Sequence, residues 1–402
     1  MLSRQGAAIT VVSVTLVVAG RLFGIFELFV LGAGGAALVV AAAVFVGLTR
    51  VHLDVSRELR PGRVYAGQPA TVHLRVHNRG ARPTPVLTLR DVVEGIDGAA
   101  CVVLAPLAVD QTVGATYSLP TDRRGALAVG PMEVRVSDPF GLATVSSAGA
   151  PVSELVVWPS VEPVLPLPLG PGDARDRDAD PSGTPGTYGD ELYALRPYTD
   201  GDDRRLVHWR ASARYDHLVV RQHERPAPGR ATIVLDTRLG AYEGETFERA
   251  VSAAASIALA CARHQLQVRL ITAAGHDSGF GGDHRHFEGI MEHLAVVKQR
   301  DLGHLPTLVA SLRRPGTGRL GPAAVITGTG ADGSGLGGLG EAGAPAITVV
   351  AFAAAAAAGR HAARGGGDGS AIVVDATTTF EAAWNQALAS PGTTTWASVT
   401  GR

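Results

Sequence analysis

Two long apolar runs fill the first fifty positions of the chain and are separated by a short polar break. Residues 6–20 contain no charged side chain, and residues 28–48 are apolar without interruption. About 20 consecutive apolar residues allow a helix to cross a bilayer. The first run reaches this length if it continues through residues 22–26 while Arg21 extends its charge to the interface. The pattern therefore predicts a transmembrane helical hairpin over residues 1–50.

Basic side chains flank these runs on one side, and this predicts the orientation. Arg4 precedes the first run, whereas the connecting segment holds Arg21 beside Glu27. The second run is followed by Arg50, Arg57, Arg60 and Arg63. Because Lys and Arg near the spans stay in the cytoplasm, we expect a two-pass protein of the cell membrane with both termini and its folded domains in the cytoplasm. A cleaved signal peptide is the alternative, but no small-residue cleavage site followed by soluble sequence precedes the second run.

Short alternating runs characterise the next segment. Apolar or alternating stretches such as residues 71–76 and 132–136 recur about every ten positions, and turn-forming stretches such as residues 78–80 separate them. This spacing predicts a β-sandwich of antiparallel strands over residues 51–160. Residues 161–190 then change to Pro, Gly, Asp and Arg, which offer little apolar surface, so we expect a flexible linker there.

From position 230 the pattern becomes an alternation of strands and helices. Buried strands are predicted at residues 232–236, 266–272, 323–327, 347–352 and 372–375, with helices at 247–264 and 379–388. This order is typical of a mainly parallel sheet covered by helices, so residues 230–402 are expected to form an α/β domain. Such sheets place ligands at the carboxyl ends of their strands, where Asp236 follows the first strand.

Composition adjusts this picture in two respects. Apolar residues make up 46% of the 402 residues and charged residues 18%, which agrees with contact between part of the chain and a lipid bilayer. The formal net charge of −1 provides no field that would favour DNA or RNA, so no nucleic-acid partner is expected. Cys101 and Cys261 lie far apart in apolar stretches and are expected as buried thiols.

A dense cluster of charge precedes the α/β domain, within residues 191–229. Nine charged side chains fall between Arg196 and Asp216, and Gly201 stands among aspartates that can pair with the neighbouring arginines. Exposed ion pairs contribute only about 0–1 kcal/mol each, so such a cluster is better explained by partial burial or by a partner. We expect one partly buried network formed by Arg196, Asp202, Asp203, Arg205, His208, Trp209 and Arg214.

Two motifs carry a resemblance to a known family. The first is Asp138-Pro139-Phe140-Gly141-Leu142, in which Phe140 is expected to plug the end of the sandwich core. The second comprises Arg196, Tyr198, Gly201, Asp202, Asp203, Arg205, His208, Trp209, Ala213 and Arg214. Together they resemble the domain of unknown function family 58, whose members have the same order of two spans, sandwich, motif and α/β domain. The resemblance implies a von Willebrand A-like (Rossmann-like) α/β domain, with a MoxR-type AAA+ ATPase and a transglutaminase-like membrane protein as partners, and no settled reaction.

Three functions remain open at this point. The first is a non-enzymatic membrane-anchored scaffold or adaptor that docks a partner, with no catalytic residue, cofactor or metal. The second is a hydrolase with His208 as general base and Asp202 or Asp203 as its orienting group or acid; Ser212 and Tyr198 are then the only nucleophiles that the motif offers.

The third function is a metal-dependent binding module of the von Willebrand A type. The resemblance places a metal-binding Asp-x-Ser-x-Ser loop at Asp236, but Arg238 and Gly240 replace both serines, so Asp236 marks a degenerate metal-loop position. Residues 276–288, which contain three histidines, are a second possible source of ligands.

Overall fold

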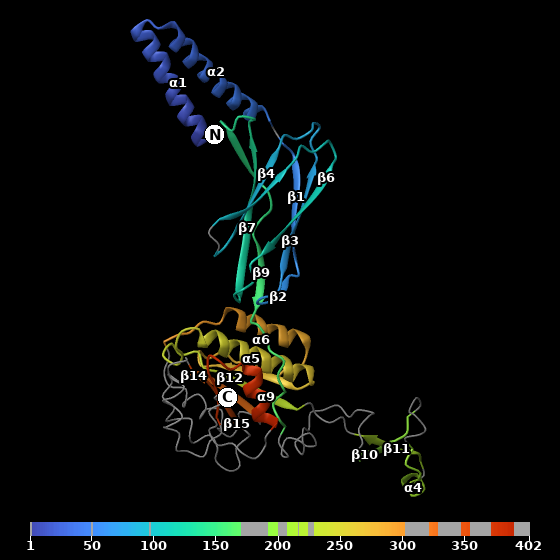
Figure 1. The fold of residues 1–402 in the computed structure, drawn as a ribbon. Helices are drawn as coiled ribbons and strands as arrows, with labels where there is room; N and C mark the ends of the chain where they lie inside the picture. Colours follow the sequence, from blue (N-terminus) through green and yellow to red (C-terminus); the bar gives the residue numbers. More distant parts are fainter. Residues whose placement is uncertain are drawn as a thin grey trace. The chain divides into compact units, whose positions relative to one another are not determined.

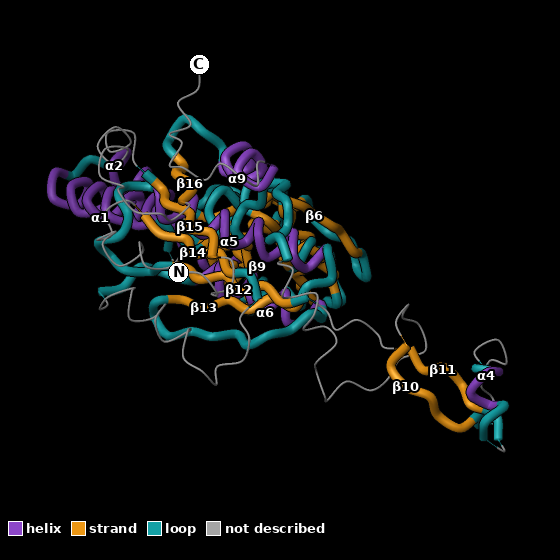
Figure 2. Tube along the Cα trace, turned by 90° about the horizontal axis from the view of Figure 1, so that it is seen from below, coloured by secondary structure: helices purple, strands orange, loops and turns teal. Residues whose placement is uncertain are grey.

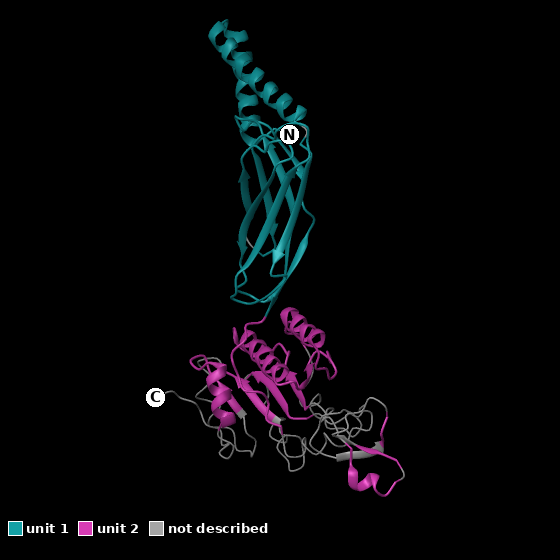
Figure 3. Ribbon diagram, turned by 90° about the vertical axis from the view of Figure 1, so that its right-hand side faces the viewer, with its two compact units in different colours: residues 1–158 teal, residues 159–402 magenta. Residues whose placement is uncertain are grey.

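The computed structural model describes residues 2–49, 51–95, 98–169, 192–199, 207–215, 217–223, 229–301, 321–328, 347–353 and 371–389. The chain divides into two compact units, Met1–Trp158 and Pro159–Arg402, which are coloured separately in Figure 3. The first unit contains a helical hairpin and a β-sheet region. The second contains a parallel sheet with helices and a short two-stranded ribbon.

The N-terminal hairpin consists of α1 (Arg4–Phe23) and α2 (Phe26–Leu48), shown in blue in Figure 1. Both helices, of 20 and 23 residues, are long and apolar enough to cross a membrane. Glycine allows them to pack closely, because a Cβ atom on Gly32 would lie 2.7 Å from the Ser13 carbonyl oxygen. Gly24, with φ of 69°, ends α1 in a left-handed conformation that glycine adopts without strain. The two predicted apolar helices are confirmed.

Two sheets form the rest of the first unit. The three-stranded sheet has the order β1-β3-β6, and the six-stranded sheet has the order β2-β9-β7-β4-β5 with β8 paired to β7. The strands are β1 (Leu53–Arg60), β2 (Arg63–Tyr65), β3 (Ala70–Asn78), β4 (Leu87–Val93), β5 (Ala99–Leu104), β6 (Thr112–Leu119), β7 (Gly125–Ser137), β8 (Thr144–Ala148) and β9 (Ser153–Trp158). Alternate residues of β3 and β4 are buried, and Val72 and Leu89 from the two sheets belong to one core. This is the strand-rich region that the alternation predicts.

The turn at Asp138 differs from the expectation for Phe140. Phe140 is 64% exposed and therefore does not plug the core. The turn is instead held by the buried Asp138 carboxylate, which accepts hydrogen bonds from the backbone N–H of Phe140 at 2.8 Å and of Ala143 at 2.6 Å. Leu142 and Ala143 are buried and pack in a cluster with Val39 of α2.

The second unit is built on a five-stranded parallel sheet with the order β13-β12-β14-β15-β16, visible in Figure 2. Its strands are β12 (Arg230–Leu235), β13 (Gln267–Thr272), β14 (Ala323–Gly328), β15 (Ile347–Phe352) and β16 (Ala371–Val374). The helices are α5 (Thr246–Arg263), α6 (His284–Val296) and α9 (Phe380–Ala389). All residues of β14 are buried, as expected of a strand covered on both faces. The predicted parallel sheet with helices is confirmed.

The expected linker over residues 161–190 is packed along its first part. Glu162 N–H donates to the Ser256 hydroxyl at 2.9 Å, and the Trp384 indole donates to the Leu165 carbonyl at 2.8 Å. Leu167 is only 1% exposed. Composition alone predicted flexibility here, but apolar side chains such as Leu167 bury themselves on the α/β domain. Residues 170–190 lie outside the described residues.

Candidate functional site

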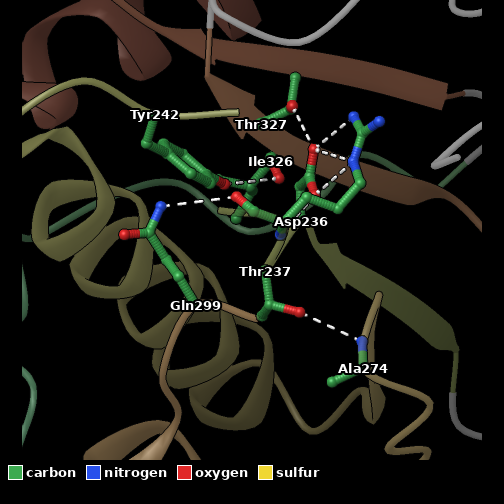
Figure 4. A network of polar contacts seen from close by, with 8 residues as sticks. Asp236, Thr237, Tyr242, Ala274, Gln299, Ile326 and Thr327 are labelled. Carbon is green, nitrogen blue, oxygen red and sulfur yellow. Dashed lines mark hydrogen bonds and ion pairs between the residues drawn. The ribbon is translucent and has the colours of Figure 1, made fainter. Parts of the chain in front are cut away.

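Polar side chains gather at the carboxyl edge of the parallel sheet, which Figure 4 shows from close by. Asp236 and Thr237 follow β12, and Thr327 lies near the end of the neighbouring strand β14. All three residues are at most 1% exposed. Because parallel strands end at the same edge, residues distant in sequence meet there, and this is the edge where open α/β sheets bind ligands.

The Asp236 carboxylate is surrounded by donors. The Arg238 guanidinium donates Nε–H to Oδ1 at 3.0 Å and Nη2–H to Oδ2 at 2.8 Å, and the Arg238 backbone N–H donates to Oδ1 at 3.0 Å. The Thr327 hydroxyl donates to Oδ2 at 2.7 Å. The side chain of Asp236 is 0% exposed and that of Arg238 is 13% exposed. A buried charge is therefore both paired and hydrogen-bonded, which offsets its loss of hydration.

Backbone contacts fix the loop that follows β12. Arg300 N–H donates to the Thr237 carbonyl, and Leu239 N–H donates to the Arg300 carbonyl, each at 2.8 Å. The Thr237 hydroxyl accepts from Ala274 N–H at 3.1 Å. Gly328 must lack a side chain here, because a Cβ atom would collide with the Ala241 carbonyl. The loop is thus tied to Ala274 after β13 and to Arg300 after α6, and it packs against Gly328 at the end of β14.

Tyr242 lies in the segment after β12, and its side chain is buried. It is 8% exposed, and its hydroxyl donates to the Ile326 carbonyl at 3.2 Å. Burial, together with the nearby Asp236 charge, raises the pKa of Tyr242 well above its ordinary value. Tyr242 is therefore a neutral donor that joins the loop to β14.

A metal ion does not fit the ligands at this edge. Both Asp236 oxygens already accept hydrogen bonds, and the two serines of a metal-binding loop are replaced by Arg238 and Gly240. In the part of the chain that the structure describes, no group of three or more His, Cys, Asp or Glu side chains is placed to hold a metal ion. The degenerate position at Asp236 is therefore an ion pair formed within the chain.

The polar side chains of residues 276–288 also contact separate partners and do not converge on one point where a metal ion could bind. The His276 and His293 rings stack with centroids 3.5 Å apart, and Asp277 pairs with Arg269. The Asp283 carboxylate caps α6 by accepting from His286 N–H at 2.7 Å. These side chains hold local structure, so the second possible source of metal ligands is not supported.

Part of the charged motif lies in a two-stranded ribbon, which we call the motif arm. The motif arm consists of the described residues 192–199, 207–215 and 217–223. It comprises β10 (Leu192–Pro197), α4 (Trp209–Ser212) and β11 (Val219–His223), with Arg196 opposite Val220 in the antiparallel pair. The Tyr198 N–H donates to the Leu218 carbonyl at 2.8 Å. Gly201, Asp202, Asp203 and Arg205 lie outside the described residues.

His208 and Ser212 contact the backbone of the motif arm. His208 Nδ1 accepts from Ala211 N–H at 3.0 Å and so caps α4. The Ser212 hydroxyl accepts from Val219 N–H at 2.9 Å and donates to the His208 carbonyl at 3.2 Å. Both side chains therefore hold the turn between α4 and β11, and the Ser212 hydroxyl is directed to backbone groups.

The outer surface of the motif arm differs from the expected buried network. Trp209 is 67% exposed and Tyr215 57% exposed, and Ala213 and Arg214 are exposed as well. The buried apolar side chains of the motif arm are those of Val207, Ala211, Val219 and Val220. The prediction that Trp209 and Arg214 are partly buried is therefore wrong, because smaller apolar side chains are buried in the motif arm and the large ones lie at its surface.

Comparison with known proteins gives one family and several distant structural likenesses. Residues 194–307 match a family model described as "Protein of unknown function DUF58", so this part of the chain is a DUF58 family domain, as the motifs predicted. It includes the motif arm from residue 194 onward and Asp236. None of the curated proteins compared matches the sequence.

The likenesses to solved structures are weak. A CARDB domain of a Pyrococcus furiosus protein, solved in complex with di-metal ions, has 16% identity; the match covers 27% of this chain and 86% of that chain, with a TM-score of 0.20. The putative ApaA protein from Bordetella pertussis has 18% identity over 27% of this chain and 96% of that chain, also with a TM-score of 0.20. At these TM-scores neither likeness carries an argument about fold or function.

Proposed function

We propose that this chain is a membrane-anchored, non-enzymatic adaptor whose motif arm docks a cytoplasmic partner protein, a MoxR-type AAA+ ATPase. The observation that carries the proposal is the outer surface of the motif arm. There Trp209 and Tyr215 are more than half exposed, beside the exposed Arg210 and Arg214. Trp, Tyr and Arg are the residue types that dominate binding hot spots between proteins.

The architecture of the motif arm supports a docking role. β10 and β11 form a two-stranded sheet, and α4 has only 4 residues. A two-stranded ribbon is marginally stable in water unless further strands or a packed surface cover it. A partner that covers Trp209 would supply such a surface.

The polar side chains at the sheet edge around Asp236 and in the motif arm support a non-enzymatic role. Asp236 is held by Arg238 and Thr327, and His208 and Ser212 bond to the backbone around α4. Each of these side chains serves the local fold in the structure. A general base needs a free nitrogen or oxygen within reach of a substrate proton, and Nδ1 of His208 already accepts a backbone proton donor.

The identity of the partner and its side of the membrane rest on the sequence. The resemblance to family 58 implies a MoxR-type ATPase, with a transglutaminase-like membrane protein as a further member of the assembly. The arginines that flank the two apolar helices favour a cytoplasmic position for the folded units, where an ATPase has access to nucleotide.

Two experiments test the proposal. In the first, membranes containing the full chain are extracted at alkaline pH; the chain should remain in the membrane pellet, and a C-terminal reporter that works only in the cytoplasm should be active.

In the second, the purified chain in lipid nanodiscs is mixed with the MoxR-type ATPase of the same organism. A complex should elute ahead of either component in size-exclusion chromatography, and empty nanodiscs are the control. Release at alkaline pH, or separate elution at high micromolar concentration, contradicts the proposal.

A further inference from the structure

The ion pair at Asp236 is asymmetric in its exposure. The carboxylate is wholly buried, whereas the Arg238 side chain is 13% exposed. A carboxylate in such a place needs a cation or hydrogen-bond donors that remain in position. Arg238 contributes both, because its main-chain N–H and its side chain donate to the same carboxylate.

We propose that Arg238 is the resident cation of this sheet edge: its guanidinium supplies the charge and the hydrogen bonds that Asp236 requires, so the loop after β12 keeps its shape without a metal ion. The planar fork of a guanidinium matches the two oxygens of a carboxylate and keeps its charge at any pH at which proteins fold. The loop is therefore insensitive to chelators.

The rest of the loop holds Arg238 in the geometry that this role requires. Residues on both sides of Arg238 exchange backbone hydrogen bonds with Arg300, at 2.8 Å each. The Gln299 amide donates to the Arg238 carbonyl at 3.5 Å. Thr327 completes the set from β14 by donating to Oδ2. The contacts with Arg300 and Gln299 restrict the main chain at Arg238 and do not involve the ion pair, whereas Thr327 adds a donor to the same carboxylate.

A second ion pair in the same unit provides a matched control. Arg269 donates Nε–H to Asp277 Oδ1 at 2.8 Å, and its side chain is 13% exposed, as that of Arg238 is. The Asp277 side chain, however, is 42% exposed, so water can hydrate it when the arginine is removed. Loss of charge pairing should therefore matter at Asp236 and not at Asp277.

Native-state hydrogen exchange of the full chain in detergent micelles tests the proposal, with the backbone amides of residues 237–242 as a local readout. Arg238→Met keeps the aliphatic stem and strands the carboxylate, so protection should fall about 100-fold or more, as for a broken buried pair. Adding Asp236→Asn removes the stranded charge, and the double variant should regain most of that loss. Arg269→Met should leave these amides unchanged. Wild-type protection should be equal in chelator and in millimolar Mg²⁺ or Mn²⁺.

Other results overturn the proposal. Wild-type-like protection in Arg238→Met means that the guanidinium is dispensable. Equal losses of protection in the single and double variants mean that Arg238 stabilises the loop through packing and not through its charge. A rise in wild-type protection with Mg²⁺ or Mn²⁺ means that a metal displaces Arg238. If Arg238→Met does not fold, folding of the double variant supports the proposal, and failure of both contradicts it.

Discussion

At the scale of single residues, buried carboxylates in both units are compensated by arginine. In the first unit, Arg57 of β1 donates Nη1–H to Asp91 of β4 at 2.7 Å, and both side chains are 1% exposed. Tyr117 donates to the other Asp91 oxygen at 2.6 Å. Burial and this hydrogen bond raise the pKa of Tyr117 far above its ordinary value. Because β1 and β4 belong to different sheets, the ion pair joins the two sheets through their shared core.

Removing Arg57 should therefore be costly. Arg57→Met leaves the Asp91 charge buried beside Tyr117, and we expect the free energy of unfolding to fall by about 3–5 kcal/mol. Thermal melting of the full chain in detergent measures this. Arg60→Met is the control, because the pair between Arg60 and Glu58 has both side chains more than 60% exposed; its melting temperature should be that of the wild type. Equal melting temperatures for the two variants would show that Asp91 does not depend on Arg57.

The stacked histidines predict a pH dependence. Burial, with a smaller effect of the neighbouring His276, lowers the pKa of His293 from 6.5 to about 4. The unfolded chain therefore binds a proton at this residue between about pH 6.5 and pH 4, where the folded chain does not. By linkage, the stabilising effect of the neutral ring is complete above pH 6.5 and decreases as the pH falls through this window.

Melting temperatures of the wild type and of His293→Asn, measured between pH 7.5 and pH 4, test this dependence. The wild type should lose more stability than the variant as the pH falls, because only the wild type gains a proton on unfolding at this position. An NMR titration that places the His293 pKa at or above 6.5 would contradict the account.

At the scale of elements, the two apolar helices pack through glycine on one face only. A Cβ atom on Gly32 would lie 2.7 Å from backbone atoms of Ser13 and Val17, whereas one on Gly34 would meet nothing within 4 Å. Gly34 lines an open groove on the hairpin together with Leu16 and Leu31. The two glycines stand two residues apart in one helix and differ in whether α1 lies against them.

This difference gives a paired test of the hairpin. Gly32→Leu should force α1 and α2 apart and lower the melting temperature of the full chain in detergent, because close backbone approach supplies much of the packing between membrane helices. Gly34→Leu adds the same side chain toward open space and should melt like the wild type. If both variants melt alike, the contact between Gly32 and α1 does not hold the hairpin.

Helices and strands that form regular apolar runs could be predicted from the sequence. Features that depend on contacts with other elements could not. The two apolar helices and the strands of the parallel sheet follow from runs of apolar residues. The predicted run at residues 132–136 is only part of β7 (Gly125–Ser137), because Gly130 and Pro131 interrupt the pattern, although the strand continues along β4 with a register shift near Val93. The packing of residues 161–169 depends on the surfaces of α5 and α9, which composition does not reveal.

The candidate site shows the same division. Asp236 and Arg238 stand two residues apart, so an ion pair between them can be predicted from the sequence. Thr327 could not be predicted as its partner, because its contact depends on β14 lying beside β12, a strand order that local sequence does not specify. The exposure of Trp209 depends likewise on which side chains are buried in the motif arm, and local sequence does not specify this.

At the scale of the whole molecule, the chain combines parts with different tasks. Two apolar helices are long enough to cross a membrane, the two sheets of the first unit share one core, and the DUF58 domain covers the motif arm from residue 194 onward. The buried carboxylates of Asp91 and Asp236 are each paired with an arginine. The motif arm exposes Trp209 and Tyr215 beside Arg210 and Arg214, and this is the basis of the adaptor account.

The affinity of the nanodisc-embedded chain for the MoxR-type ATPase, compared between wild type and Trp209→Ala, tests this account most directly. Trp209 is 67% exposed, so the substitution should leave the melting temperature unchanged, while loss of a hot-spot side chain should raise the dissociation constant about 30-fold or more. Phe140→Ala is the control, since Phe140 is 64% exposed but lies in the first unit; its dissociation constant should equal that of the wild type. A Trp209→Ala variant that binds the ATPase as tightly as the wild type would contradict docking through the motif arm.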